Sequence, residues 1–357
     1  MTNPPPPAVV DRRSLYKKLA ISLLPAVAFV WVLKSGGLPL LPAREDLARV
    51  DVGGLVLFVF IWFAHYFVRT ARWYLLLAPI QRVPLWTVIR VACIGFLAVG
   101  LLPFRMGEAV RPILIRREGR LTAWAATGTV GAERVVDGLS ISLILLISLR
   151  IAKPLDPLPD RIGELPIPAA LVPGAAYVMA LVFAGGCAVM MIFYFWRTWA
   201  RKMTETVIGV VSKPLATWLA TRVEQVAEGL GFLRDARYAV PFLLATLLYW
   251  TLNASTWWVL AHACGLGQIG FFGAAATMGV VALGILVPAT PGFFGAFQLG
   301  IYCGLAMYLA PSIVMREGSV YSFLGYALPM GLATIVGLVA LLLRPRTENL
   351  AGSSATG

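Results

Sequence analysis

The feature that most constrains this chain is a series of apolar blocks, each long enough to cross the hydrocarbon core of a membrane. That core is about 30 Å thick and takes roughly 20 residues of helix to cross. Of the 357 residues, 59% are hydrophobic and only 13% are charged, against about 25% charged in a soluble domain. The blocks lack the alternation of a transmembrane barrel, so helices remain as the way to satisfy the backbone in lipid. The sequence therefore predicts an all-α polytopic membrane protein with about six to eight transmembrane helices.

The positive charge is distributed as in a membrane protein and not as in a nucleic-acid binder. The formal net charge is +13, and Lys and Arg gather in the short segments between apolar blocks. This pattern sets membrane orientation and meets anionic lipid head groups. The sequence has no long basic, aromatic-rich stretch that could follow a nucleic acid, so no nucleic-acid partner is expected. We expect a multi-pass protein of the bacterial inner membrane with both termini in the cytoplasm.

The chain divides into two membrane halves joined by a basic connector. The expected parts are a cytoplasmic tail (1–18), a first half (19–196), a cytoplasmic connector (197–239), a second half (240–345) and a cytoplasmic tail (346–357). Apolar residues in the connector recur at three or four residues, which describes an amphipathic helix serving as a plain connector or as a partner site. The first apolar stretch resembles a signal peptide or an uncleaved first span, and the long polytopic chain after it favours the span.

Two apolar blocks are interrupted in a way that simple crossings do not explain. The block within 85–120 has arginines on both flanks. A re-entrant hairpin that enters and leaves from the cytoplasm removes this conflict with the positive-inside rule. The block within 271–309 is broken around Ala289–Gly292 and, by the count of crossings, begins and ends outside. It is either a second re-entrant hairpin or two short spans.

The two interrupted blocks share a sequence pattern. Both read A-x-G-x-L and then P-x-x-x-G, first in Ala98–Gly107 and again in Ala282–Gly292 with one extra residue. Helix-broken segments paired in opposite orientation are typical of a transporter with a central site. Gly and Pro are frequent in membrane helices, so chance similarity is the alternative. The sequence predicts two broken hairpins in an inverted repeat.

Charged side chains gather at and after the first interruption, although each costs about 2.5 kcal/mol or more in the bilayer centre. The candidate substrate-binding residues are Arg105, Glu108, Arg111, Glu133, Arg134 and Asp137. On a helix Glu133 and Asp137 share one face, and Arg134 reaches Asp137. These groups either cap helices and pair near the cytoplasmic surface, or they bind substrate. In the second case Arg105 and Arg111 bind a lipid phosphate through bidentate hydrogen bonds, and the carboxylates hold the arginines.

Residues that break or loosen helices form the predicted gates at the two interruptions. They are Pro103, Gly107, Pro288, Pro291, Gly292, Gly295 and Gln298. Upstream, His65, Arg69 and Arg72 follow a span expected at 52–68, where snorkelling to the interface is favoured over ligand binding. The two histidines and four scattered cysteines predict no metal site, no disulfide framework and no cofactor. A Gly300-xxx-Gly304 spacing could bring two helices together, although it is a common pattern.

Three motifs in this order resemble the lysylphosphatidylglycerol synthase transmembrane, or flippase-like, family. They are Leu102–Pro112, Glu133–Asp137 and Pro288–Gln298, and the resemblance covers roughly 15–345. It implies a membrane domain that moves lipids such as aminoacylated phosphatidylglycerol between leaflets. Other members accompany glycolipid, hopanoid or polyprenyl-linked pathways. Members that make lysyl-lipid carry a soluble synthase domain, which is not expected here. Many members have an acidic residue where this chain has Gln298, which argues against a proton- or cation-coupled role at that position.

These features predict a flippase or scramblase-like transporter of a phospholipid or of a modified, glyco- or polyprenyl lipid. Its head group would enter a polar cavity between the two interruptions while the acyl chains stay in the membrane. One alternative is an integral membrane enzyme using Glu108 or Asp137 as a base, against which the lack of a nucleophile–His arrangement argues. Another is a non-transporting accessory subunit in lipid or cell-envelope synthesis. The expected partners are lipids with an anionic head group, together with a homo-oligomer or a lipid-synthesis enzyme.

Overall fold

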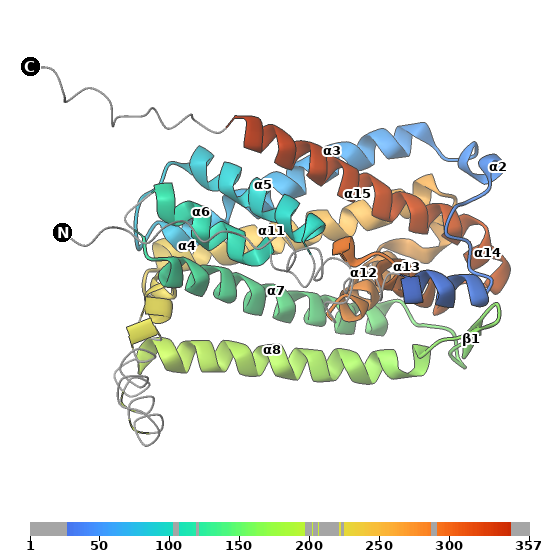
Figure 1. Cartoon of the computed structure of the whole chain (residues 1–357). Helices are drawn as coiled ribbons and strands as arrows, with labels where there is room; N and C mark the ends of the chain where they lie inside the picture. Colours follow the sequence, from blue (N-terminus) through green and yellow to red (C-terminus); the bar gives the residue numbers. More distant parts are fainter. Residues whose placement is uncertain are drawn as a thin grey trace, which may run out of the picture.

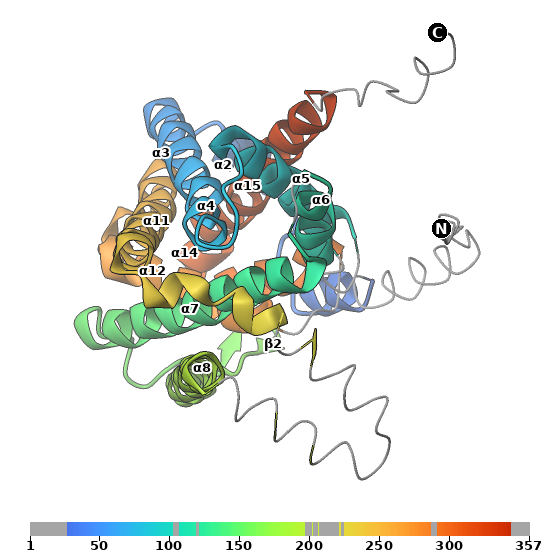
Figure 2. The same cartoon turned by 90° about the vertical axis from the view of Figure 1, so that its left-hand side faces the viewer.

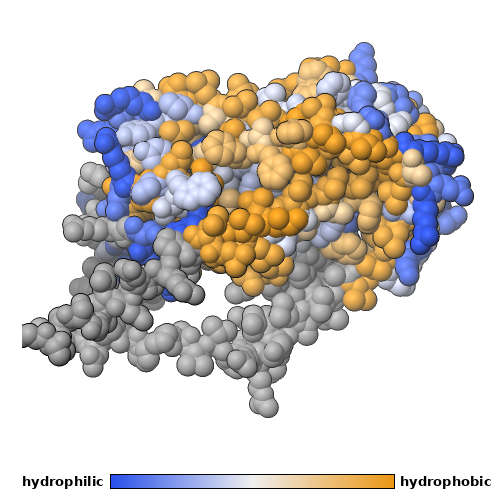
Figure 3. Space-filling model, turned by 90° about the horizontal axis from the view of Figure 1, so that it is seen from above, coloured by the Kyte–Doolittle hydropathy of each residue, from blue (hydrophilic) through white to orange (hydrophobic). Residues whose placement is uncertain are grey.

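The computed structural model of the chain describes residues 27–102, 107–118, 121–196, 202, 206, 221–222, 225–286 and 291–343. Within them, long helices run side by side along one direction (Figure 1). Four described segments are long and apolar enough to cross a membrane: Val52–Leu77, Ala169–Ile192, Gly267–Gly284 and Glu317–Leu342. A space-filling view shows a hydrophobic band between hydrophilic ends (Figure 3). The predicted all-α polytopic membrane fold is confirmed.

The helices follow one another with short connections, after a first helical segment at 27–35. The α-helices are α2 (Arg44–Leu47), α3 (Val52–Ala71), α4 (Trp73–Leu77), α5 (Leu85–Leu101), α6 (Val110–Glu118), α7 (Ala123–Ile151), α8 (Val172–Phe195), α11 (Ala236–Ala263), α12 (Gly270–Gly284), α13 (Ala296–Ala306), α14 (Pro311–Met315) and α15 (Glu317–Leu342). Short 3₁₀ turns are η2 (Ala169–Leu171), η3 (Gly231–Arg234), η4 (Gly267–Ile269) and η5 (Pro291–Phe293). Strands β1 (Arg161–Ile162) and β2 (Leu165–Pro166) form a small antiparallel pair.

Side-chain caps fix where three of the long helices begin. Asp51 accepts hydrogen bonds from the backbone N–H groups of Gly53 and Gly54 at the start of α3, at 3.1 and 2.9 Å. Thr122 accepts one from Ala125 at the start of α7, and Asp235 caps α11 in the same way. These oxygens satisfy N–H groups that the first helical turn leaves without a partner. The polar residues between apolar blocks therefore set the helix boundaries.

The two ends of the bundle differ in charge. Strands β1 and β2 lie with α2 and α14 at one end, opposite the end where α15 finishes (Figure 1). We call the first the strand end, and its acidic and basic side chains balance. We call the other the basic end, where arginines such as Arg82 in a loop and Arg116 and Arg117 at the end of α6 outnumber the acids. Seen along the bundle, α8 lies outside the other helices and packs on α7 (Figure 2).

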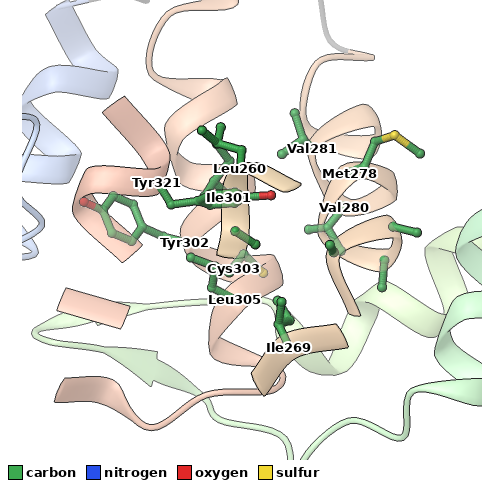
Figure 4. Close-up of a cluster of buried hydrophobic side chains, with 14 of the residues drawn as sticks. Leu260, Ile269, Met278, Val280, Val281, Ile301, Tyr302, Cys303, Leu305 and Tyr321 are labelled. Atoms are coloured by element: carbon green, nitrogen blue, oxygen red, sulfur yellow. The ribbon is translucent and has the colours of Figure 1, made fainter. Parts of the chain in front are cut away.

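Each of the two interrupted blocks forms an antiparallel pair of helices. In the pair α5–α6, Gly95 lies against Arg111 and Gly107 against Val99. In the pair α12–α13, Gly300 and Gly304 face the backbone of α12, where an added Cβ would lie 2.8 Å from the Cα atoms of Val281 and Thr277. The Gly300-xxx-Gly304 spacing, a weak signal in the sequence, does mark a close helix approach. Figure 4 shows the apolar core around this contact, with side chains of α12 and α13 facing each other.

The turn that follows α12 lies beside the C-terminal end of α5. A Cβ added to Gly292 would lie 3.4 Å from the Gly100 carbonyl oxygen and 2.8 Å from the Tyr326 hydroxyl. Gly292 and Gly295 have φ values of 61° and 90°, in the left-handed region that favours glycine. The two interrupted regions therefore meet inside the molecule.

The structure describes only part of two predicted segments. Of the predicted connector, 207–220 lies outside the described residues, and the chain after it packs on α7 where Gly229 approaches Gly128. The residues of the first predicted span before 27 also lie outside them. The span expected at 52–68 is longer than predicted, because α4 continues the helical segment to Leu77.

Candidate functional site

A cluster of buried charges is centred on Glu133 of α7, which is fully buried. Its Oε1 accepts hydrogen bonds from Nη2 of Arg72 and Nη2 of Arg134, at 3.3 and 2.7 Å. Its Oε2 accepts one from Nη2 of Arg111 at 2.7 Å. One carboxylate thus joins arginines from α3–α4, α6 and α7, at a depth where an unpaired charge would be costly.

Asp137, one turn further along α7, completes the cluster. Its two carboxylate oxygens lie 2.7 and 2.6 Å from Nη2 of Arg72. Arg134 lies 3.6 Å from the same carboxylate, and Arg72 also donates to Oγ1 of Thr246 on α11 at 3.2 Å. The predicted shared face of Glu133 and Asp137, and the predicted Arg134–Asp137 pair, are confirmed. These side chains connect four helical elements through charge.

The predicted snorkelling role is wrong for Arg72. This side chain is 1% exposed and lies inside the 26-residue helical segment Val52–Leu77. A run of arginines was interpreted as the end of a span, although apolar residues follow it directly in Trp73–Leu77. Two features of the sequence indicate that Arg72 is buried. One is the apolar run Trp73–Leu77 after it, and the other is the pair of carboxylates on α7, which require buried cations.

Aromatic rings support the arginines. The guanidinium carbon of Arg111 lies 4.2 Å from the ring centroid of Trp73, and that of Arg72 lies 4.5 Å from Tyr249. Arg69 lies closest to a ring, at 3.9 Å from Phe96. Stacking of a planar guanidinium on a ring offsets part of its desolvation cost. The rings also fix the direction in which each guanidinium presents its donors.

A cavity of about 600 Å³ opens beside the charged cluster. Its wall is mostly aliphatic and aromatic and takes residues from α3, α5, α7, α8, α11, α12, α13 and α15. The charged residues of the wall are Arg69, Glu108, Arg134 and Asp137. The cavity extends from Glu108, after the first interruption, to Phe293, after the second. Its size and its mixed lining suit one amphipathic ligand.

The predicted substrate-binding residues divide between the cavity wall and the layer behind it. Glu108, Arg134 and Asp137 line the cavity, whereas Arg111 and Glu133 are buried behind it as an ion pair. Arg105 lies outside the described residues. Arg69 lines the cavity and Arg72 holds both carboxylates, although the sequence favours a snorkelling role over ligand binding at both positions. Both contacts join helices that are distant in the sequence.

Two of the predicted gate residues, Gly107 and Gly292, lie where the two interruptions meet. Gly107 packs on α5, and Gly292 lies beside Gly100. The buried Gln298 accepts a hydrogen bond at its Oε1 from the Gly295 N–H, at 2.6 Å, which fixes the start of α13. Pro103 and Pro288 lie outside the described residues, as does the side chain of Pro291. In the described part of the chain, no group of three His, Cys, Asp or Glu side chains could hold a metal ion.

A comparison with protein families gives one match that covers most of the chain. The family described as lysylphosphatidylglycerol synthase TM region matches residues 18–315. The match contains the charged cluster, the pairs α5–α6 and α12–α13, and every cavity-lining residue except those of α15, which are Gly325, Pro329 and Ala333. No curated protein and no solved structure matches the chain.

Proposed function

Because this chain belongs to the lysylphosphatidylglycerol synthase TM region family, whose members are membrane proteins of lipid-related processes, we propose that it moves a lipid between leaflets as a flippase or scramblase. The observation that carries the proposal is the 600 Å³ cavity, charged on one part of its wall and apolar elsewhere. A lipid head group requires polar contacts inside the bilayer, and charges placed there mark substrate pathways in membrane proteins. The acyl chains remain in the apolar lining or in the membrane.

The orientation follows from charge. The basic end faces the cytoplasm, because the positive-inside rule places an excess of Lys and Arg there, whereas the strand end is balanced. The pair α5–α6 opens toward the basic end and α12–α13 toward the strand end. They are then re-entrant hairpins in opposite orientation, with the cavity between their inner turns. Alternating access follows from movement of one hairpin relative to the other.

The charged cluster gives the head group a polar site without leaving an isolated charge behind. With no ligand present, Arg134 is neutralised by Glu133 and Asp137. When a phosphate enters the cavity, Arg134 can turn toward it, because Arg72 and Arg111 still neutralise Glu133. Glu108 is on the same wall and is suited to a hydroxyl or amine of the head group.

Leaflet exchange in liposomes tests the proposal. Wild-type protein is reconstituted with a fluorescent phosphatidylglycerol, and the outer-leaflet fluorophore is quenched chemically. Ala282 lines the cavity, so Ala282→Trp should lower exchange to the rate of protein-free liposomes by filling it. Leu181 on α8 is 73% exposed and faces away from the cavity, so Leu181→Trp should exchange lipid like the wild type.

Equal exchange by both variants would exclude the cavity as the lipid route. If folded wild-type protein exchanges none of the lipids offered, the transport proposal is rejected. Product formation from a lipid-linked substrate in detergent would then identify an enzyme, since translocation requires two compartments and catalysis does not.

A further inference from the structure

The buried cluster and the cavity wall contain more arginines than carboxylates among the described residues. The arginines are Arg69, Arg72, Arg111 and Arg134, and the carboxylates are Glu108, Glu133 and Asp137. Three of the arginines form ion pairs at 2.6–2.7 Å. Arg69 forms none with any residue that the structure describes. Taken together, the cluster and the cavity wall therefore carry one more positive than negative charge among the described residues.

The surroundings of Arg69 position its guanidinium for a ligand. The guanidinium carbon lies 3.9 Å from the centroid of the Phe96 ring and 6.0 Å from that of Tyr249. Arg69 lines the cavity and, unlike the other three arginines, has no carboxylate partner among the described residues. The N–H donors along the edge of a guanidinium are those that bind an oxyanion bidentately.

We infer that Arg69, in addition to Arg134, binds the anionic phosphate ester of the lipid head group in the cavity. This inference rests on the proposed function, in which a lipid occupies the cavity. Paired N–H groups of Arg69 bind two phosphate oxygens through charge-assisted hydrogen bonds. The negative charge of the head group neutralises the excess cation at a depth where an unpaired charge is expensive. A glyceride without phosphate lacks this contact.

Binding in detergent separates the head group from the rest of the lipid. Purified protein is titrated with short-chain phosphatidylglycerol, with the diacylglycerol of the same chains and with inorganic phosphate. Trp62, Trp250 and Trp257 line the cavity, so tryptophan fluorescence reports occupancy. We expect phosphatidylglycerol to bind most tightly, because it combines the phosphate with chains that fit the apolar wall.

Arg69→Gln should weaken binding of phosphatidylglycerol about 10- to 100-fold, the range for hydrogen bonds to charged groups, and leave diacylglycerol binding unchanged. Arg69→Lys should recover part of the loss, since it restores the charge without the bidentate geometry. Arg90→Gln is the control: Arg90 pairs with Glu118 at 2.9 Å and does not line the cavity. It should bind phosphatidylglycerol like the wild type.

Equal affinity of wild type and Arg69→Gln for phosphatidylglycerol would overturn the inference, even if the wild type exchanges lipid in liposomes. If inorganic phosphate binds as tightly as phosphatidylglycerol, the site binds free phosphate, and the inference that it binds a lipid head group is overturned. The Arg69 site can also hold while the proposed transport fails, and the two experiments separate that case. Phosphate-selective binding that Arg69→Gln removes, in a protein that exchanges no lipid, would support the Arg69 site and defeat the proposed transport.

Discussion

The antiparallel pairs α5–α6 and α12–α13 begin from the same sequence pattern but are held in place by different forces. The pair α5–α6 is fixed to its surroundings by ion pairs, from Arg111 to Glu133 on α7 and between Arg90 and Glu118 within the pair. The pair α12–α13 is fixed by close backbone approach at Gly300 and Gly304 and by apolar side chains. The second pair contains no charged residue in either helix.

The difference bears on how each pair can respond to a ligand. An ion pair can be exchanged for a contact with a charged head group, so the position of α5–α6 can depend on whether the cavity is occupied. Close apolar packing offers a lipid phosphate nothing to exchange, so α12–α13 should move as one unit. A ligand shifts a conformational equilibrium only through its different affinity for the two states. The charged pair is where that difference can arise.

The largest effect should come from removing the centre of the charged network. Glu133→Gln keeps the shape but leaves Arg72, Arg111 and Arg134 with fewer negative partners in a buried site. Breaking a buried ion pair costs about 3–5 kcal/mol in free energy of unfolding. Thermal unfolding of the purified protein in detergent measures the loss.

The matched control for this change is Glu108→Gln. Glu108 lies on the cavity wall and forms no ion pair with any described residue. The unfolding temperature of the Glu108→Gln variant should therefore stay close to that of the wild type. A stability of Glu133→Gln equal to that of Glu108→Gln would mean that the ion pairs do not hold α6 and α7 together. The contrast between the two helix pairs would then be lost.

A smaller loss should follow from separating α12 and α13. Gly304→Val places a side chain where a Cβ alone lies 2.8 Å from the Cα of Thr277, and overpacking of this kind costs about 1–3 kcal/mol. Gly331→Val is the control, because a Cβ at Gly331 meets nothing within 4 Å. The stability of the two purified variants is compared by unfolding them in the same series of detergent mixtures. Equal stability of the two variants would show that the glycine contact does not fix this pair.

Local geometry explains what could be predicted from the sequence. Glu133, Arg134 and Asp137 lie within five residues on one helix, so the helical period alone places Asp137 beside both others. The close approach at Gly300 and Gly304 has the same origin, because two small residues one turn apart leave a groove on any helix. The apolar block lengths likewise predict an all-helical membrane fold without any knowledge of tertiary contacts.

Contacts between distant segments could not be predicted in this way. Arg72 precedes Glu133 by 61 residues, and no periodicity connects them. The positive-inside rule also favoured the wrong interpretation, since it treats an arginine near the end of an apolar block as interfacial. The position of Arg69 on the cavity wall depends on how α3 packs on α5 and α11. The cavity itself exists only once eight helices are assembled.

The smallest expected effect concerns the turn that starts α13, and it tests whether this region is held by a polar contact at all. Gln298→Met retains the length of the side chain but removes the acceptor of the Gly295 N–H, at a cost of about 1 kcal/mol. Gln298→Glu retains an acceptor but buries a charge, because Gln298 is 4% exposed and does not line the cavity, so its stability should also fall below that of the wild type. If Gln298→Met lowers stability and also changes the leaflet-exchange rate, the turn contributes to gating. If stability falls while exchange is unchanged, the hydrogen bond only anchors α13. Movement of the pair α12–α13 must then be controlled by other contacts, and the charged contacts of α5–α6 are those that remain.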